Sequence, residues 1–272
     1  MPTEWGRWPE STNQEPGDNK VTERQVVIIT GSSRGIGRSA AGLLASRGHA
    51  VVISSRNQDS CEAVASEIRE QGGEAIAQAC HIGREEQLQE LVDAATGKYG
   101  RLDAVVMNAA SNPVYGPSNQ VDRDVFDVIM RNNVYSAMRL AHFARPRLAE
   151  SDNGAVALVS SIAGSFGNQA IGVYGMSKAA ENQLVRNLAL EFGPYGIRVN
   201  AVAPGLVKTD FAQALLDDER VVKYFEKTTP LRRLAGPEDI ARVIAFLVGP
   251  DSGWLSGQVI TADGGLSVTG GF

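Results

Sequence analysis

The feature that most constrains this chain is a regular alternation of short β-branched segments with longer stretches of helical periodicity, beginning at Val26. Short apolar segments of this kind predict buried strands, and the stretches between them are long enough for crossover helices. Strands that alternate with helices form a mainly parallel sheet covered on both faces, with right-handed crossovers. The seven predicted strands span residues 26–29, 50–53, 75–79, 104–107, 155–159, 198–202 and 258–261. We therefore predict an α/β fold built on a doubly wound, parallel, seven-stranded sheet.

The sequence also predicts how the chain is organised. Residues 1–22 are rich in polar residues, proline and glycine, and we expect a polar N-terminal arm that cannot form a core alone. An alternative is that its two tryptophans, Trp5 and Trp8, dock on the body or on a neighbouring subunit. Residues 23–272 are expected to form one domain. Its longest interruption, about residues 205–230, carries a predicted apolar helix over 211–225 and is typical of a lid over a substrate site.

Composition excludes several classes of function. The formal charge of −5 argues against nucleic-acid binding, which needs a basic face. Neither a membrane-spanning apolar run nor a signal-peptide core is found, so we expect no membrane partner. The three histidines are scattered, which predicts no metal site, and Cys61 and Cys80 read as buried thiols of a reducing compartment. We expect a cytoplasmic protein.

A glycine-rich turn follows the first predicted strand. Residues 30–37 read Thr-Gly-Ser-Ser-Arg-Gly-Ile-Gly and precede a helical pattern. Glycines allow a tight turn and let backbone N–H groups approach a pyrophosphate at the positive end of the helix. The turn therefore predicts a dinucleotide site.

The end of the second predicted strand indicates which dinucleotide binds. NAD-binding sheets place an acidic residue there for the ribose 2′-hydroxyl. Residues 52–57 contain no acid and instead carry Arg56, whose guanidinium suits a 2′-phosphate, and Arg34 in the glycine turn could reach the same group. We predict NADP(H) rather than NAD(H) as cofactor.

An acid/base pair is predicted on a later helix. Tyr174 and Lys178 are four residues apart, so they share one helix face. A neighbouring ammonium favours phenolate, and we expect it to lower the pKa of the tyrosine. The strand before this helix ends in Ser160 and Ser161, at the sheet edge where ligands bind, and a serine there can hydrogen-bond a substrate oxygen.

In their order and spacing these motifs resemble the short-chain dehydrogenase/reductase family, whose single domain has a Rossmann-type fold. The resemblance runs from about Val21 to Gly265 and includes the segments 200–205 (Asn-Ala-Val-Ala-Pro-Gly) and 263–265 (Asp-Gly-Gly). It selects Ser161 over Ser160, because the family's serine stands thirteen residues before the tyrosine. The catalytic residues that it implies are Asn133, Ser161, Tyr174 and Lys178.

The resemblance also implies roles and a cofactor site. Tyr174 is the acid/base, Lys178 binds the nicotinamide ribose and lowers the tyrosine pKa, Ser161 holds the reacting oxygen, and Asn133 holds a water that links Lys178 to solvent. The implied cofactor-binding residues are Gly31, Ser33, Arg34, Gly35, Ile36, Gly37, Ser55, Arg56, His81, Ile82, Asn108, Ala109, Tyr174, Lys178, Pro204, Gly205, Val207 and Thr209.

Two motifs depart from the family pattern. The family's Asn-Asn-Ala-Gly is here Met-Asn-Ala-Ala over residues 107–110, and the acid that usually follows the third strand is replaced by His81. Both variants, with Ser-Ser-Arg at 54–56, are similar to the NADPH-dependent carbonyl (retinal) reductase branch. We therefore interpret His81 as a residue near the adenine, not as a metal ligand or base.

The resemblance implies hydride transfer between the nicotinamide and a ketone, aldehyde or secondary alcohol. The expected walls of the substrate site are mostly apolar and come from residues 112–115 and 165–171 and from the lid residues Leu206, Phe211 and Leu215. Two alternatives stay open: reduction of 3-oxoacyl groups on acyl carrier protein or coenzyme A, and a non-catalytic NADP(H)-binding protein. A sugar-nucleotide epimerase is disfavoured because it needs a larger substrate domain. A homotetramer assembled through helices near 122–148 and 173–192 is also implied.

Overall fold

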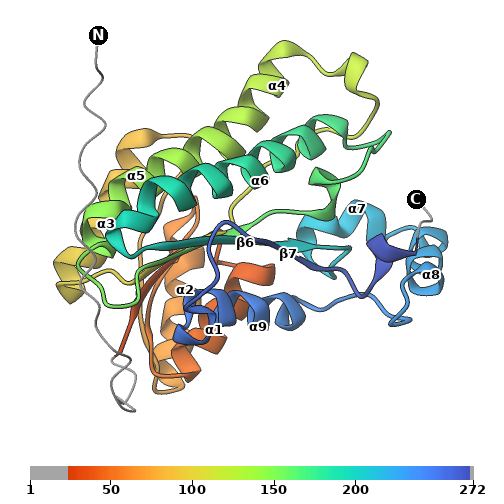
Figure 1. Cartoon of the computed structure of the whole chain (residues 1–272). Helices are drawn as coiled ribbons and strands as arrows, with labels where there is room; N and C mark the ends of the chain where they lie inside the picture. Colours follow the sequence, from red (N-terminus) through yellow and green to blue (C-terminus); the bar gives the residue numbers. More distant parts are fainter. Residues whose placement is uncertain (1–23, 270–272) are drawn as a thin grey trace, which may run out of the picture.

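The computed structural model describes residues 24–269, so the arm predicted over residues 1–22 lies outside the described residues. Seven parallel strands form one sheet in the order β3-β2-β1-β4-β5-β6-β7 (Figure 1). The predicted fold class is confirmed, and the seven strands fall where the sequence predicted them. They are β1 (Val26–Thr30), β2 (Ala50–Ser54), β3 (Glu74–Ala77), β4 (Ala104–Met107), β5 (Ala155–Val159), β6 (Arg198–Pro204) and β7 (Val259–Ala262).

Helices cover both faces of the sheet (Figure 1). One layer consists of α1 (Gly35–Ser46), α2 (Gln58–Glu70) and α9 (Pro237–Val248), and the other of α3 (Glu85–Tyr99), α5 (Ser136–Leu148) and α6 (Gly172–Phe192). Side chains alternate along each strand, so Val27 and Ile29 pack with the first layer while Val26 and Ile28 pack with the second. This burial on both faces explains why the strands read as continuous apolar segments.

The helical stretch before β5 is interrupted by a π-helical turn. Helix α4 (Arg123–Met130) passes into π-helix at Arg131–Tyr135 and then continues as α5. Asn132 and Asn133 lie buried inside this turn. Because π-helical turns insert one extra residue per turn and gather at functional sites, this one is a first structural sign that Asn133 belongs to the site.

The segment after β6 differs from the prediction. The single helix expected over 211–225 is wrong: the segment forms a short 3-10 turn (Asp210–Ala212), α7 (Gln213–Leu216) and α8 (Glu219–Thr228). The break falls at Asp217 and Asp218, because the Asp218 carboxylate accepts from the N–H of Arg220 at 2.9 Å and so starts a new helix.

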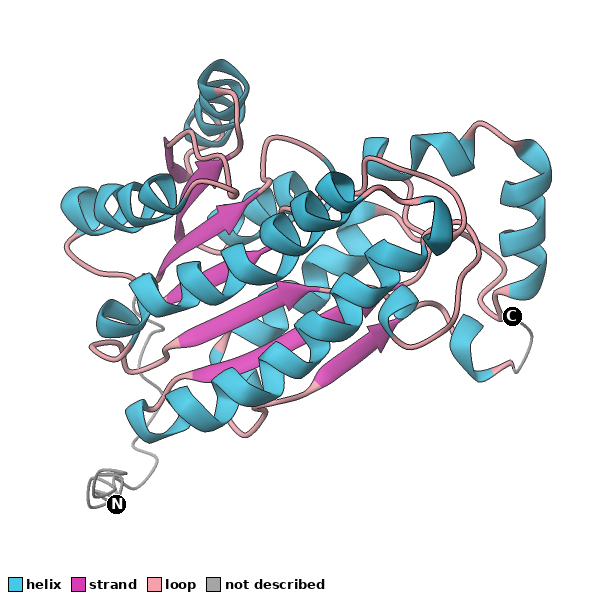
Figure 2. Ribbon diagram, turned by 90° about the horizontal axis from the view of Figure 1, so that it is seen from above, coloured by secondary structure: helices cyan, strands magenta, loops and turns pink. Residues whose placement is uncertain are grey.

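These lid helices lie beyond the carboxyl ends of the strands. The strand arrows in Figure 2 run toward the side of the sheet on which they are found. Helix α8 contains no buried residue, whereas α6 buries a complete face. The carboxyl edge of the sheet, where ligands bind in doubly wound folds, is therefore flanked by one firmly packed helix and one exposed segment.

Candidate active site

The turn between β1 and α1 is held by the residues that follow β4. Asn108 donates from Nδ2 to the carbonyl oxygens of Thr30 and Gly31, both at 3.0 Å. The Thr30 hydroxyl accepts from the N–H groups of Asn108 and Ala109, each at 3.1 Å. These bonds join β1 and β4 where the strand order reverses, which is the position at which doubly wound sheets bind their ligands.

Glycine is required at several positions of this turn. A Cβ atom on Gly37 would lie 2.5 Å from the Gly31 carbonyl oxygen, and Gly35 has a φ of 55°, in the left-handed region. Helix α1 then begins after Arg34, whose side chain makes no capping hydrogen bond, and its first turn holds no acidic residue. The N-terminus of α1 is therefore open to an anion, and the turn fits a dinucleotide pyrophosphate.

The two arginines predicted for a 2′-phosphate are placed differently. Arg56 is exposed just past the end of β2, and no acidic side chain within residues 24–269 pairs with it. Arg34 instead lies 3.5 Å from the carboxylate of Asp210, across the gap between the glycine turn and the lid segment. Arg56 is thus the cation that is free to meet a phosphate beside β2.

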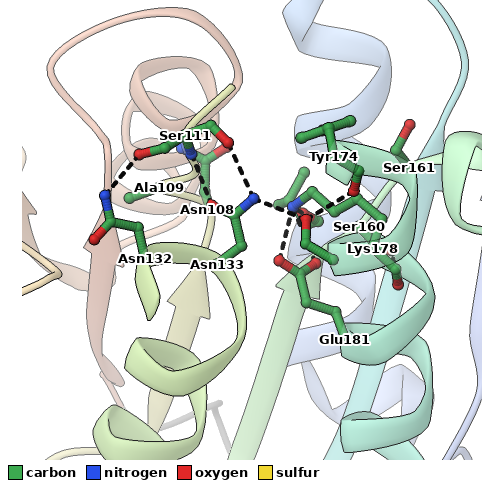
Figure 3. A network of polar contacts seen from close by, with 12 residues as sticks. Asn108, Ala109, Ser111, Asn132, Asn133, Ser160, Ser161, Tyr174, Lys178 and Glu181 are labelled. Atoms are coloured by element: carbon green, nitrogen blue, oxygen red, sulfur yellow. Dashed lines mark hydrogen bonds and ion pairs between the residues drawn. The ribbon is translucent and has the colours of Figure 1, made fainter. Parts of the chain in front are cut away.

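Tyr174, Lys178 and Ser161 come together at the carboxyl edge of the sheet (Figure 3). Tyr174 and Lys178 lie on the same face of α6, both buried, with the lysine Nζ 5.4 Å from the centre of the tyrosine ring. Ser161 follows β5, accepts from the N–H of Ala163 at 3.1 Å, and hydrogen-bonds the Tyr174 hydroxyl. The arrangement can donate a proton and a hydrogen bond to one oxygen atom.

Ser160 has a different role from Ser161. Its hydroxyl donates to Oδ1 of Asn182 at 2.7 Å, inside the contact between β5 and α6. Of these two serines, Ser161 is the one that interacts with the Tyr174 phenol.

The acidity of Tyr174 departs from the expectation. Burial raises the pKa of its phenol, and this effect outweighs the opposing field of Lys178 and the hydrogen bond with Ser161. Glu181 raises the pKa of Tyr174 further. The predicted fall in the tyrosine pKa is therefore wrong for this site, because the sequence did not show how completely the phenol is buried.

The side chain of Asn133 forms hydrogen bonds to two neighbouring segments. Its Oδ1 accepts from the N–H of Ser111 at 2.7 Å, and its Nδ2 donates to Oγ of Ser177 at 2.9 Å. Ser177 in turn donates to the carbonyl oxygen of Tyr174 at 2.7 Å. Asn133 thus connects the segment after β4 to the helix of the tyrosine, and its side chain is not bonded to Lys178.

Sequence reasoning missed Ser111, Ser177 and Glu181. The serines carry no motif of their own, and their contacts depend on the π-helical turn. Glu181 left a signal that could have been found: it falls on the apolar face of α6, four and seven residues before the buried Val185 and Leu188.

The other predicted cofactor residues lie along the same edge of the sheet. His81 turns into its own loop, where Nδ1 accepts from the N–H of Gly83 at 3.0 Å. Thr209 lies against the glycine turn, since a Cβ on Gly35 would come within 3.3 Å of its methyl group. The remainder are Ser33 and Ile36 in the β1–α1 turn, Ser55 after β2, Ile82 after β3, and Pro204, Gly205 and Val207 at the end of β6.

Aromatic side chains from two loops surround the tyrosine. The ring of Phe211, in the segment after β6, lies 5.9 Å from that of Tyr174. Tyr115, after β4, is close enough to influence the Tyr174 pKa. A single β-bridge joins Gly116 to Ile171, so the loops after β4 and β5 run side by side. Phe211 therefore gives the phenol an apolar neighbour.

Metal chemistry has no ligand set in the part of the chain that the structure describes, since no three His, Cys, Asp or Glu side chains gather there. Within the same residues no helix has the length and hydropathy needed to span a bilayer. Cys61 and Cys80 are buried free thiols.

A doubly wound sheet with an open, glycine-rich turn at its switch point defines a Rossmann-type fold. The family model described as enoyl-(acyl carrier protein) reductase matches residues 31–267. The chain belongs to the short-chain dehydrogenase/reductase family of oxidoreductases.

Individual relatives support the same family assignment. Dehydrogenase/reductase SDR family member 4 of Sus scrofa is 35% identical over 91% of this chain and 89% of its own length. The 7alpha-hydroxysteroid dehydrogenase of Escherichia coli K12 is 36% identical over 91% of this chain and 96% of its own.

Two solved structures share the fold. A short-chain type dehydrogenase/reductase from Mycobacterium ulcerans has a TM-score of 0.86 and 31% identity, covering 90% of both chains. A 7 alpha-hydroxysteroid dehydrogenase complexed with NADH and 7-oxo glycochenodeoxycholic acid has a TM-score of 0.85 and 35% identity, covering 89% of this chain and 93% of that one.

Proposed function

We propose that this protein is an NADP(H)-dependent oxidoreductase that interconverts a ketone or aldehyde and the corresponding alcohol. The observation that carries the proposal is the buried Tyr174, held against Ser161 and Lys178 beside an open helix N-terminus. A non-catalytic NADP(H)-binding protein would not need this set of residues, and all four implied catalytic residues are present.

The cofactor proposal rests on two features of the chain. The glycine turn and the open end of α1 suit the pyrophosphate, and the unpaired Arg56 suits a 2′-phosphate. The solved relative that binds NADH shows that the family also uses the other cofactor, which makes Arg56 the residue to test. When bound, the nicotinamide supplies or accepts the hydride.

The residues of this chain supply the proton and hold the reacting oxygen. In reduction Tyr174 gives its phenolic proton to the carbonyl oxygen, while the Ser161 hydroxyl donates a hydrogen bond where negative charge develops. Lys178 stabilises the phenolate that remains. In oxidation the phenolate takes the alcohol proton, so one tyrosine serves both directions. Asn133 holds the loop after β4 in a fixed position relative to α6 through its hydrogen bonds to both.

The substrate is proposed to be uncharged or lipophilic. Phe211 and Tyr115 face the tyrosine, and the loops after β4 and β5 contribute no evident clamp for a carboxylate or phosphate. A solved relative is complexed with 7-oxo glycochenodeoxycholic acid, and the oxo group of that compound is consistent with a ketone substrate.

A second candidate is the reduction of 3-oxoacyl thioesters. It is favoured by the matching family model, whose description names an acyl carrier protein. The same Tyr174 and Ser161 chemistry would serve it, because only the keto end of an acyl chain needs to reach the phenol.

A substrate panel tests the proposal. Purified protein is assayed with NADPH and with NADH against diketones, aromatic ketones, oxo-steroids and acetoacetyl thioesters, and with NADP⁺ against the matching alcohols. We expect NADPH oxidation with the apolar ketones. Activity confined to the thioesters would support the second candidate, and no turnover with any substrate would contradict both enzyme proposals.

We further propose a cytoplasmic homotetramer. Exposed apolar side chains on the helices expected to form its interfaces support the assembly: Phe126, Tyr135, Met138, Met176 and Leu190. Sedimentation at several concentrations and fractionation of cells that express the protein test the two statements separately.

A further inference from the structure

A carboxylate lies beneath the acid/base pair, on the buried face of α6. Glu181 is 4% exposed, and both of its carboxylate oxygens accept from the Lys178 ammonium, at 2.9 and 3.0 Å (Figure 3). The third proton of that ammonium goes to the carbonyl oxygen of Val159, at 2.9 Å. The cation next to Tyr174 is therefore held by a carboxylate one helical turn further along.

Few ionisable groups surround this pair. Tyr174 and Lys178 are on the same helix as Glu181, and Tyr115, in the loop after β4, is close enough to raise the Tyr174 pKa. The other elements packed here contribute neutral groups: Asn133 and Ser136 from the helix before β5, and the Val159 carbonyl and Ser161 hydroxyl from the end of β5. Lys178 is the only charged partner of Glu181 within the described residues, so the main electrostatic interaction of each charge is with the other.

Burying a carboxylate has a free-energy cost that an apolar residue at the same position would avoid. The position continues the buried series Val185, Leu188 and Phe192 of α6, where leucine or valine would fit the pattern. Burial raises the pKa of Glu181 to about 7, against the opposing effect of Lys178. An ionisable group retained at this cost beside a catalytic tyrosine points to a function in the reaction.

We propose that Glu181 is a positioning residue that sets the acid/base range of Tyr174: its carboxylate holds Lys178 and offsets the lysine charge, which keeps the phenol protonated. The inference rests on the proposed function, since it concerns the same tyrosine. It assigns the resting site to the proton-donating form and so favours reduction of a carbonyl.

The direction of the effect follows from counting charges. With Glu181 ionised, the Lys178–Glu181 pair is neutral, and loss of the phenolic proton leaves a net negative charge in a buried site. Without the carboxylate the lysine is an uncompensated cation, and loss of the same proton leaves the site neutral. As long as Lys178 stays protonated, removing the charge of Glu181 therefore lowers the pKa of Tyr174.

The test measures the phenol directly and needs neither cofactor nor substrate. Tyrosinate formation is followed by ultraviolet difference titration in the wild-type chain, Glu181→Gln, Tyr174→Phe and the double variant. The titration of Tyr174→Phe is subtracted from that of the wild type, and the titration of the double variant is subtracted from that of Glu181→Gln. Each difference is the titration of the Tyr174 phenol alone. We expect the acid dissociation constant of Tyr174 to rise at least about tenfold in Glu181→Gln, one pKa unit. An unchanged or higher pKa overturns the proposal.

Two further variants keep the test decisive. Glu191→Gln removes a carboxylate from the exposed face of the same helix and should leave the Tyr174 titration unchanged. Should Glu181→Gln fold poorly, Glu181→Leu restores the apolar pattern and carries the same expectation.

Kinetics separate this inference from the proposed function. In carbonyl reduction the alkaline limb of the kcat profile should move to lower pH in Glu181→Gln by the same amount as the phenol titration. A purely structural role would lower kcat or stability without moving that limb. A shifted phenol in a protein with no oxidoreductase activity would sustain the inference and refute the proposed function, and activity with an unshifted phenol would do the reverse.

Discussion

Two helical regions border Tyr174, and they are held in opposite ways. Helix α6 carries the tyrosine on a buried face, and hydrogen bonds from Lys178 and Asn133 join it to β5 and to the loop after β4. The lid segment carries Phe211 against the same ring, yet α8 buries no residue, and the Arg34–Asp210 pair between lid and glycine turn is exposed. In the proposed mechanism the proton donor therefore lies on a closely packed helix, while the substrate contacts lie on an exposed segment that can vary.

The largest expected effect comes from a substitution on α6, the closely packed helix of this comparison. Tyr174→Phe keeps the ring but removes the proton, so turnover should fall on the order of 10²- to 10⁴-fold. NADPH binding, followed by fluorescence titration, and thermal unfolding should be nearly unchanged. Near-normal turnover in this variant would show that the tyrosine is not the acid/base.

The second prediction concerns the proposed cofactor site just after β2. Arg56→Asp places a carboxylate where the 2′-phosphate is proposed to bind, so the ratio of kcat/KM for NADPH to that for NADH should fall at least about tenfold, or about 1.4 kcal/mol. Arg47→Asp, at the far end of α1, changes the same charge and should leave the ratio alone. Equal ratios in wild type and Arg56→Asp would remove the argument for NADP(H).

The lid side should respond through substrate selection. Phe211→Ala removes an apolar ring beside Tyr174 against which a bulky ketone would pack, so KM for such ketones should rise about two- to tenfold, or about 0.5–1.4 kcal/mol, with a smaller change for small ketones. Because Phe211 is 46% exposed, the urea midpoint should hardly move. Tyr224→Ala, on exposed α8, is the matched control. A uniform loss of kcat would mean that the lid shapes the chemistry as well.

The smallest effect is expected where the lid returns to the body. Asp239 accepts from the Gly236 N–H at 2.9 Å and pairs with Arg233, and this hydrogen bonding lowers the pKa of Asp239 to about 2. A folded-state pKa below the ordinary value of 3.8 stabilises the protein above that pH and loses its effect as pH falls toward 2. Asp239→Ala should therefore cost about 1 kcal/mol near neutrality.

Urea unfolding at a series of pH values checks this prediction. The stability difference between wild type and Asp239→Ala should shrink below pH about 4, and kcat should be unaffected throughout. A difference that persists unchanged in acid would assign the effect to packing instead of to the ionised carboxylate.

The sequence predicted the parts of the molecule that local patterns determine. The strands at 104–107 and 155–159 agree with β4 and β5 at both ends, because buried parallel strands are continuous apolar segments. The glycine turn was recognised from its place after the first strand, Tyr174 and Lys178 from their four-residue spacing, and Ser161 from the spacing that the family resemblance implies.

What the sequence did not predict depends on contacts between distant segments. The break at Asp217 and Asp218 was missed because an apolar stretch alone does not show where a side chain will cap a new helix. The raised pKa of Tyr174 required knowing that folding buries the phenol and places Glu181 beside Lys178. Both misses concern polar side chains whose partner is decided only by folding.

The π-helical turn at Arg131–Tyr135 has a consequence for how this chain tolerates length changes. Each residue rotates an α-helix by about 100°, so the extra residue in the turn sets the phase of all that follows. The stripe of small and branched side chains by which α5 meets the sheet, including Ala137, Leu140 and Ala144, depends on that phase. Shortening the turn by one residue would rotate this stripe toward solvent and move Asn133 away from Ser177. The packing of α5 and the geometry of the site therefore depend on the same inserted residue.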